Sequence, residues 1–465
     1  MNIRGVILAL VLGAPAAALL LLGPRGERDL PPGRVLVRYW DKWAGVEGAA
    51  VQRIVRRFNE TVGAERNIWV DYNAVSDVEK RMLIATAGGD PPDVAGLYDH
   101  VVPQFADQGA LLALDDLVRE FGIDLEAFKP IWLEIGRYDG RLYALPSTPY
   151  TIALYYNRRL LREVGLEPDR PPQTTAELTA YAVRLTRRDL ATGRLVQLGF
   201  TSSPAMLGWW HWIWPFFFDE RLWDGRHFTL DTPRTRQAIA WTIEQRVAMG
   251  SVGRTPPVDP RHANNDVLAF EAAAGVIEGA QNPFLAERLA LVFQGPWLAN
   301  WARTYAPQLD YGVAPFPSSS RDRRNAFAST DVFVIPRGAR RVREAMVFLA
   351  YLMRQDVLEE LCRAHGKVSP FREPSPAFLA GHPNPHIQVF DALAASPDAF
   401  GYPKMPVWAE AWTELLALHE TVLRGGRDPY DTLAEAQRKM ERVVAEYQRM
   451  AARRLERQSS KRSVQ

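Results

Sequence analysis

Apolar runs alternate with helix-like repeats over the first hundred residues of the chain. Residues 35–40 and 68–75 have the apolar character of strands, and residues 90–97 lead into a third strand. Between the first two strands, over residues 51–58, apolar side chains recur at helical spacing. Strands that are separated by helices pair in parallel, so the pattern predicts an α/β fold whose first lobe is doubly wound.

Polar and aromatic residues stand where the first and third of these strands end. Open α/β sheets bind their ligands outside the carboxyl ends of the strands. The candidates for a ligand site at this edge are Trp40, Asp41, Lys42 and Trp43 after the first strand, and Tyr98 and Asp99 after the third.

Prolines interrupt the next strand-like segment. The turn Asp139-Gly140 predicts a tight hairpin. Pro146 and Pro149 then break the run that follows, since neither carries an N–H for a sheet ladder, and an apolar run over residues 151–156 restarts it. A strand that stops and restarts predicts the passage of the chain from one lobe to another, with Tyr150 at the crossing. An ordinary loop inside one sheet is the alternative.

Tryptophan-rich segments mark the second half of the chain. The densest stretch is residues 207–218, where a helix with aromatic rings on every side must be largely buried and leaves about two rings to face a cleft. A strand over residues 289–293 runs into Gly295-Pro296-Trp297, with the proline suited to a first helical position. A later strand, residues 327–335, is interrupted by Ser329-Thr330-Asp331, and Trp408 opens the last helical region.

Composition and charge limit the functions that the chain can have. Its 465 residues carry 56 basic and 54 acidic side chains, a net charge of +2, which gives no field that attracts nucleic acid. The chain has one cysteine, Cys362, so it forms no intramolecular disulfide. Residues 1–33 have the layout of a secretory signal or a short membrane anchor with a tether, and we favour the retained anchor.

Five motifs resemble the bacterial extracellular solute-binding proteins of family 1, the sugar-type group that includes maltose-binding protein. They are Phe58-Asn59-Glu60, Gly89-Asp90-Pro91-Pro92-Asp93-Val94, Gly140-Arg141-Leu142-Tyr143-Ala144-Leu145-Pro146, Tyr155-Tyr156-Asn157 and Gly295-Pro296-Trp297. The resemblance implies a two-lobed periplasmic-binding-protein fold of type II, in which each lobe is a sheet flanked by helices and crossing strands join the lobes. The expected lobes are residues 34–147 plus 306–336 and residues 148–305 plus 337–465.

The same resemblance implies positions for the ligand-binding residues. The family's Gly-Pro-Trp tryptophan stacks on a sugar ring, and by position Trp210 and Trp214 of the aromatic segment also reach the ligand. A sugar needs flat rings for its C–H face and strong hydrogen-bonding groups around its rim, which charged side chains supply best. We therefore predict a ligand site composed of Trp40, Asp41, Lys42, Trp43, Tyr98, Asp99, Tyr150, Trp210, Trp214, Trp297, Thr330, Asp331 and Trp408.

The function that this implies is a carbohydrate receptor outside the cytoplasm, in the periplasm or on the outer face of the cytoplasmic membrane, secreted or anchored by its N-terminal segment. It delivers a mono- or oligosaccharide to the permease subunits of an ABC importer by hinge closure, as a monomer without cofactor or metal. The alternatives are a carbohydrate-active enzyme and the same fold with a phosphorylated polyol or a polyamine as ligand. No nucleophile elbow, phosphate-binding Gly-rich loop or His-Glu-x-x-His motif supports catalysis, so we expect no enzyme.

Overall fold

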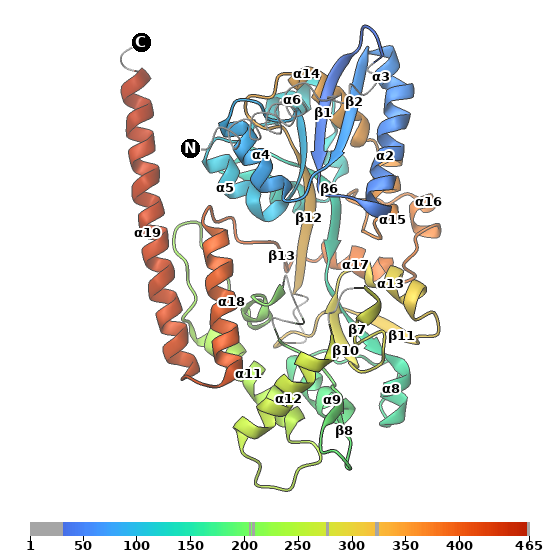
Figure 1. The fold of residues 1–465 in the computed structure, drawn as a ribbon, viewed down its shortest axis with the longest axis vertical. Helices are drawn as coiled ribbons and strands as arrows, with labels where there is room; N and C mark the ends of the chain where they lie inside the picture. Colours follow the sequence, from blue (N-terminus) through green and yellow to red (C-terminus); the bar gives the residue numbers. More distant parts are fainter. Residues whose placement is uncertain (1–30, 204–205, 207–209, 276–278, 321–324, 463–465) are drawn as a thin grey trace, which may run out of the picture.

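The computed structural model describes residues 31–203, 206, 210–275, 279–320 and 325–462. Two α/β lobes lie one above the other, with the blue first part of the chain in the upper lobe and the green and yellow middle part in the lower lobe (Figure 1). The predicted fold, two lobes that crossing strands connect, is confirmed.

The first lobe is built on a six-stranded sheet. Its strand order is β13-β12-β3-β1-β2, with β6 paired to β12. Strands β1, β2 and β3 are parallel, as the alternation of strands and helices predicted. The bounds are β1 Val35–Asp41, β2 Ile68–Ala74, β3 Val94–Tyr98, β6 Leu145–Thr151, β12 Ala326–Val334 and β13 Ala399–Phe400.

Helices cover the first sheet and fill its connections. They are α2 Gly45–Glu60, α3 Val62–Glu65, α4 Val78–Ala87, α5 Val102–Asp107, α6 Asp115–Glu120, α7 Pro130–Ile135, α14 Val342–Leu352 and α15 Gln355–Ala364, with the short helices η1 Asp99–Val101 and η2 Leu125–Ala127. The predicted hairpin at Asp139-Gly140 is confirmed as β4 Arg137–Tyr138 and β5 Arg141–Leu142.

The second lobe has a three-stranded antiparallel sheet of order β10-β7-β11. Its strands are β7 Ala153–Asn157, β10 Leu291–Gln294 and β11 Tyr311–Ala314, beside a small β8 Arg187–Arg188 and β9 Leu195–Gln197 pair. Its helices are α8 Arg158–Glu163, α9 Thr175–Leu185, η4 Trp214–Phe218, α11 Pro233–Gly250, α12 Pro260–Ala274, η5 Gly279–Gln281 and α13 Leu298–Tyr305. Asn157 caps α8 by accepting a hydrogen bond from the Leu160 backbone N–H at 2.9 Å.

The last third of the chain completes both lobes. It contains α16 Pro376–Ala380, α17 Ile387–Ala394, α18 Trp408–Arg424 and α19 Pro429–Arg462. Helix α19 packs against α18 and continues upward along the left side of the molecule in Figure 1. An ion pair of 2.7 Å between Arg454 of α19 and Asp107 of α5 connects this helix to the first lobe.

The interlobe crossing differs from the predicted one, because the two prolines do not break the strand. Strand β6 runs through Pro146 and Pro149, which lie opposite Val332 and Thr330 of β12. Among the described strands β6 pairs with β12 alone, so it is an edge strand, where a residue without an N–H is tolerated. The break comes at Ile152, between β6 in the first sheet and β7 in the second.

Strand β12 is likewise continuous. The polar residues from Ser329 to Asp331, predicted to interrupt it, lie inside it, and the irregularity is a register shift between Thr330 and Val332.

The strand pairing and the helix contacts also bear on the lobe boundaries. Strand β11 pairs with β7 in the second sheet, and α14 and α15 contact β1 and β6 of the first. The division of the chain into lobes therefore stays a proposal. These contacts would assign β11 to the second lobe and α14 and α15 to the first.

Candidate functional site

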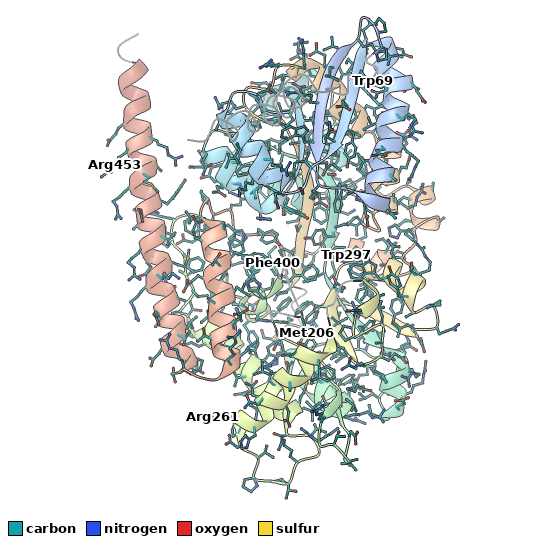
Figure 2. The ribbon with its side chains drawn as sticks, viewed as in Figure 1. Trp69, Met206, Arg261, Trp297, Phe400 and Arg453 are labelled. Carbon is teal, nitrogen blue, oxygen red and sulfur yellow. The ribbon has the colours of Figure 1, made fainter. Side chains whose placement is uncertain are left out.

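A cavity of about 1100 Å³ lies between the lobes. Its walls come from both sheets: Trp43 follows β1, Asp99 follows β3, Tyr150 lies on β6, Asp331 on β12 and Trp297 after β10. Figure 2 labels Trp297 in the region between the lobes. The volume is at the upper end of what small-molecule sites enclose, so the cavity can hold a ligand larger than one sugar ring.

The indole of Trp297 is folded back over the turn that precedes it. Strand β10 ends at Gln294, and a Cβ placed on Gly295 would lie 2.2 Å from atoms of the Trp297 ring. Only glycine allows this close approach. The glycine of the Gly-Pro-Trp motif therefore fixes the direction of the ring at the N-terminus of α13.

Aromatic rings line two sides of the cavity. Trp297 meets Tyr150 edge to face at 5.0 Å between ring centroids, and Trp210 at 5.8 Å with an interplanar angle of 34°. On the opposite side Trp43 meets His365 edge to face at 4.7 Å. Such pairs hold one another at fixed angles, so the rings form a rigid wall before any ligand binds.

A buried ion-pair network lies beneath the floor of the cavity. The ammonium group of Lys42 is 3.0 Å from a carboxylate oxygen of Asp331 and 3.6 Å from one of Asp41, and it donates a hydrogen bond to the Leu97 carbonyl. Tyr39 donates its phenol hydrogen bond to Asp41. Burial alone would lower the pKa of Lys42, but the two carboxylates raise it, so this lysine remains charged.

Lys367 brings a second ammonium group into the same network. Its Nζ is 3.9 Å from Asp331, 4.1 Å from the ring centroid of Tyr150 and 4.3 Å from that of Trp297. Burial lowers the pKa of Lys367 to about 8, with Asp331 opposing that shift. Among the described side chains and backbone groups, none accepts a hydrogen bond from this Nζ. Lys367 lines the cavity, so its ammonium group can donate to a ligand oxygen there.

Asp99 is held by hydrogen bonds from β12 and from the backbone N–H of His100 in η1. It accepts hydrogen bonds from the Ser329 hydroxyl at 3.0 Å and from the Thr330 backbone N–H at 3.3 Å. Burial nevertheless raises the pKa of Asp99 to about 7, because these hydrogen bonds do not replace full hydration of a carboxylate. Near neutral pH this group can either donate or accept a hydrogen bond.

Seven of the thirteen predicted site residues line the cavity, and these are Trp43, Tyr98, Asp99, Tyr150, Trp210, Trp297 and Asp331. Asp41 and Lys42 support the floor from below through the network with Asp331. Thr330 is buried in β12, where its hydroxyl donates to the Asp331 carbonyl.

The remaining three predicted residues pack elsewhere. Trp214 is 1% exposed and lies among Phe200, Phe293 and Phe316 of the second lobe. Trp408 is buried against Trp212. Trp40 faces the side of β1 opposite to Asp41, since successive strand residues point to opposite faces, and it packs on the core below α4 and α5. Residues 207–209 of the aromatic segment lie outside the described part of the chain.

Several residues that line the cavity were not predicted from the sequence. They are Glu47, Arg53, His100, Gln294, Asn300, Trp301, Arg303, Tyr305, Glu360, Arg363, His365, Lys367 and Tyr402. Burial lowers the pKa of His100 and of His365 to about 4, so both present neutral imidazoles. For Trp301 and Tyr305 a signal existed, because they follow Trp297 at intervals of four residues on one helix. Lys367 comes from a distant turn and has no local signal.

Within the described residues, no three His, Cys, Asp or Glu side chains gather as metal ligands would.

Two α/β lobes that share a pair of long strands and enclose a cavity between them define a solute-binding receptor. The chain belongs to the bacterial extracellular solute-binding protein family, whose sequence profile matches residues 43–357. The predicted family is thereby confirmed, and with it an extracytoplasmic place of action. In the part of the chain that the structure describes, no helix is long and apolar enough to cross a membrane. The predicted anchor lies almost wholly in residues 1–30, outside that part.

Solved structures share the fold over nearly the whole chain. CpMnBP1 with mannotriose bound aligns with a TM-score of 0.72 and 23% identity, over 87% of this chain and 99% of that one. UgpB from Mycobacterium tuberculosis, in complex with glycerophosphocholine, aligns with a TM-score of 0.71 and 22% identity, over 90% and 100%. A protein from Brucella abortus (strain 2308), provisionally named a binding protein, is 24% identical to this chain over 369 residues. The match covers 78% of this chain and 82% of that protein.

Proposed function

We propose that this protein is a carbohydrate receptor that delivers a sugar to an ABC importer. The observation that carries the proposal is the wall formed by Trp297, Tyr150 and Trp210 above buried hydrogen-bonding groups. Flat rings match the C–H face of a pyranose. The carboxylates of Asp99 and Asp331 and the ammonium of Lys367 match its hydroxyl rim, where charge-assisted hydrogen bonds are strongest.

The mechanism follows from the strands that the lobes share. Because β6 and β12 cross between the lobes, a small change in their backbone angles can open or close the cavity. A ligand in contact with Trp43 on one wall and Trp297 on the other binds the closed form better than the open one, and so shifts the population toward closure. Permease subunits in the membrane would then recognise the closed form. We also propose that the receptor is a monomer and that its N-terminal segment anchors it.

Isothermal titration calorimetry with a sugar panel tests the proposal. The panel comprises glucose, mannose, maltose, maltotriose, mannobiose and mannotriose. We expect at least one member to bind the wild type and to bind Trp297→Ala about thirtyfold more weakly. No heat from any sugar at millimolar concentration would count against a carbohydrate receptor.

One observation favours a second candidate ligand, a phosphorylated polyol. The Lys367 ammonium and the guanidinium group of the half-buried Arg363 line one cavity. The neighbouring structure of UgpB from Mycobacterium tuberculosis holds glycerophosphocholine. Glycerol 3-phosphate and glycerophosphocholine therefore belong in the same titration. Their binding in place of every sugar would select this second candidate.

A further inference from the structure

One face of α13 carries a stripe of aromatic rings. Trp297, Trp301 and Tyr305 are four residues apart, so they lie above one another on the same side of the helix, and all three line the cavity. The neighbouring face of the helix, formed by Leu298, Ala299 and Ala302, is buried. Trp297 and Trp301 pack against the core with part of each ring and line the cavity with the rest, whereas Tyr305 is not part of the core cluster.

Exposure increases along the stripe. Trp297 and Trp301 are partly buried, whereas Tyr305 is 53% exposed. Four residues of an α-helix rise about 6 Å along its axis, which is of the order of the length of one hexose unit in an unbranched chain. The stripe thus leads in steps of one sugar unit from the inner cavity at Trp297 to its rim at Tyr305.

Polar groups flank the stripe on both sides. On α13 itself these are Asn300, Arg303 and Thr304. On the facing wall they are Glu47 and Arg53 of α2 and Glu360 and Arg363 of α15. Rings bordered by amide, carboxylate and guanidinium groups suit a ligand that has apolar faces and hydroxyl edges along its whole length.

We propose that Trp301 and Tyr305 extend the Trp297 site into a track for an unbranched oligosaccharide of about three units, with the outer units lying along α13 toward the rim. This inference rests on the proposed function, because it assigns the length of the ligand to the same receptor. Each added unit gains one ring contact, so affinity increases with chain length until the track ends at Tyr305.

Calorimetry with matched length series tests the track. The probes are mannose, mannobiose and mannotriose, and glucose, maltose and maltotriose. For the series that binds, we expect wild-type affinity to increase with each unit. Trp301→Ala should weaken the trisaccharide about tenfold and leave the monosaccharide within about twofold, and Tyr305→Ala should reduce only the gain from the third unit.

Control variants remove aromatic rings away from the cavity. Trp69→Ala on β2 and Tyr430→Ala on α19 delete partly exposed rings that do not line it, and both should leave the whole length series unchanged. Thermal unfolding of each variant verifies folding, and Trp301→Phe should restore most of the trisaccharide affinity if stacking is the cause.

The two proposals fail in different ways. Equal affinity of the wild type for one and three units, or an equal loss for mono- and trisaccharide in Trp301→Ala, would overturn the track while leaving the receptor in place. An absence of binding by every sugar would overturn the receptor, and the track with it.

Discussion

The ammonium group of Lys367 lies 4.3 Å from the centroid of the Trp297 ring. The two residues come from different parts of the chain, the turn after α15 and the start of α13, and they meet only where both elements border the cavity. A cation on an aromatic face is favourable when little water is present. A sugar that stacks on Trp297 must therefore share or replace this contact, and Lys367 then turns its donors to the ligand.

Ligand affinity should fall as the pH rises from 7 to 9. The pKa of Lys367 is lowered to about 8, so its ammonium is lost over this range. Calorimetry at pH 6, 7, 8 and 9 measures the effect, and in Lys367→Met the affinity should be lower and independent of pH above 7. Asp99→Asn serves as a control for the other group that titrates nearby. A Lys367→Met profile that still falls above pH 8 would assign the dependence to another group.

Lys367 should also make the folded protein more stable as the pH rises, whereas ligand affinity falls over the same range. The pKa of Lys367 is lower in the folded protein than the 10.5 of an ordinary lysine, so the unfolded chain binds more protons between pH 8 and 10. Raising the pH over that range therefore relieves a cost of folding. Chemical denaturation should show a more positive pH slope in the wild type than in Lys367→Met.

Asp99 should make the protein less stable as the pH increases from 5 to 8. Its pKa is raised to about 7 by burial, so the folded state holds a proton that the unfolded chain has already lost. The stabilising contribution is present at acid pH and lost through about pH 7, a change on the order of 2 kcal/mol. Asp99→Asn carries no charge and should remove this slope, apart from a constant offset for one changed hydrogen bond. The check is the free energy of unfolding at pH 5 and pH 8 for both proteins.

Substitution of Trp297 should mainly weaken ligand binding, and substitution of Trp214 should mainly lower the stability of the fold. Trp297→Ala deletes a ring on the cavity wall and should weaken ligand binding by ~2 kcal/mol with a small effect on unfolding. Trp214→Ala deletes a core ring and should cost about 3–5 kcal/mol of stability. Its folded fraction should bind with normal affinity. Urea unfolding and calorimetry on both variants give the comparison, and a loss of affinity in folded Trp214→Ala would place this ring in the site after all.

Lys42 should matter for folding more than for ligand contact. Lys42→Met leaves the carboxylates of Asp41 and Asp331 buried without their nearest cation, which should cost about 3–5 kcal/mol. The double variant Lys42→Met with Asp331→Asn should recover part of that loss, since one of the two charges is then gone. A double-mutant cycle of unfolding free energies measures the coupling. Additive losses would mean that the two side chains do not interact.

Local patterns in the sequence determined the arrangement of elements. Apolar runs of strand length and helical repeats predicted β1, β2 and β3 and their parallel pairing, because each such element follows from the alternation of its own side chains. The Gly295-Pro296-Trp297 motif predicted a ring at the end of a strand, and Trp297 lines the cavity there, since the glycine, the turn and the ring are neighbours. The cap of α8 is equally local, since Asn157 and Leu160 are three residues apart.

The tertiary structure alone decided which side chains share the cavity. Whether Pro146 breaks a strand depends on what pairs with the other edge of that strand, and among the described strands none but β12 pairs with β6. Trp214 and Trp210 have the same local character, but only the packing of Phe200 and Phe293 directs Trp214 into the core. Lys367 reaches Asp331 from a remote turn. Such contacts depend on chain segments that meet only in the folded protein, so no pattern along the sequence encodes them.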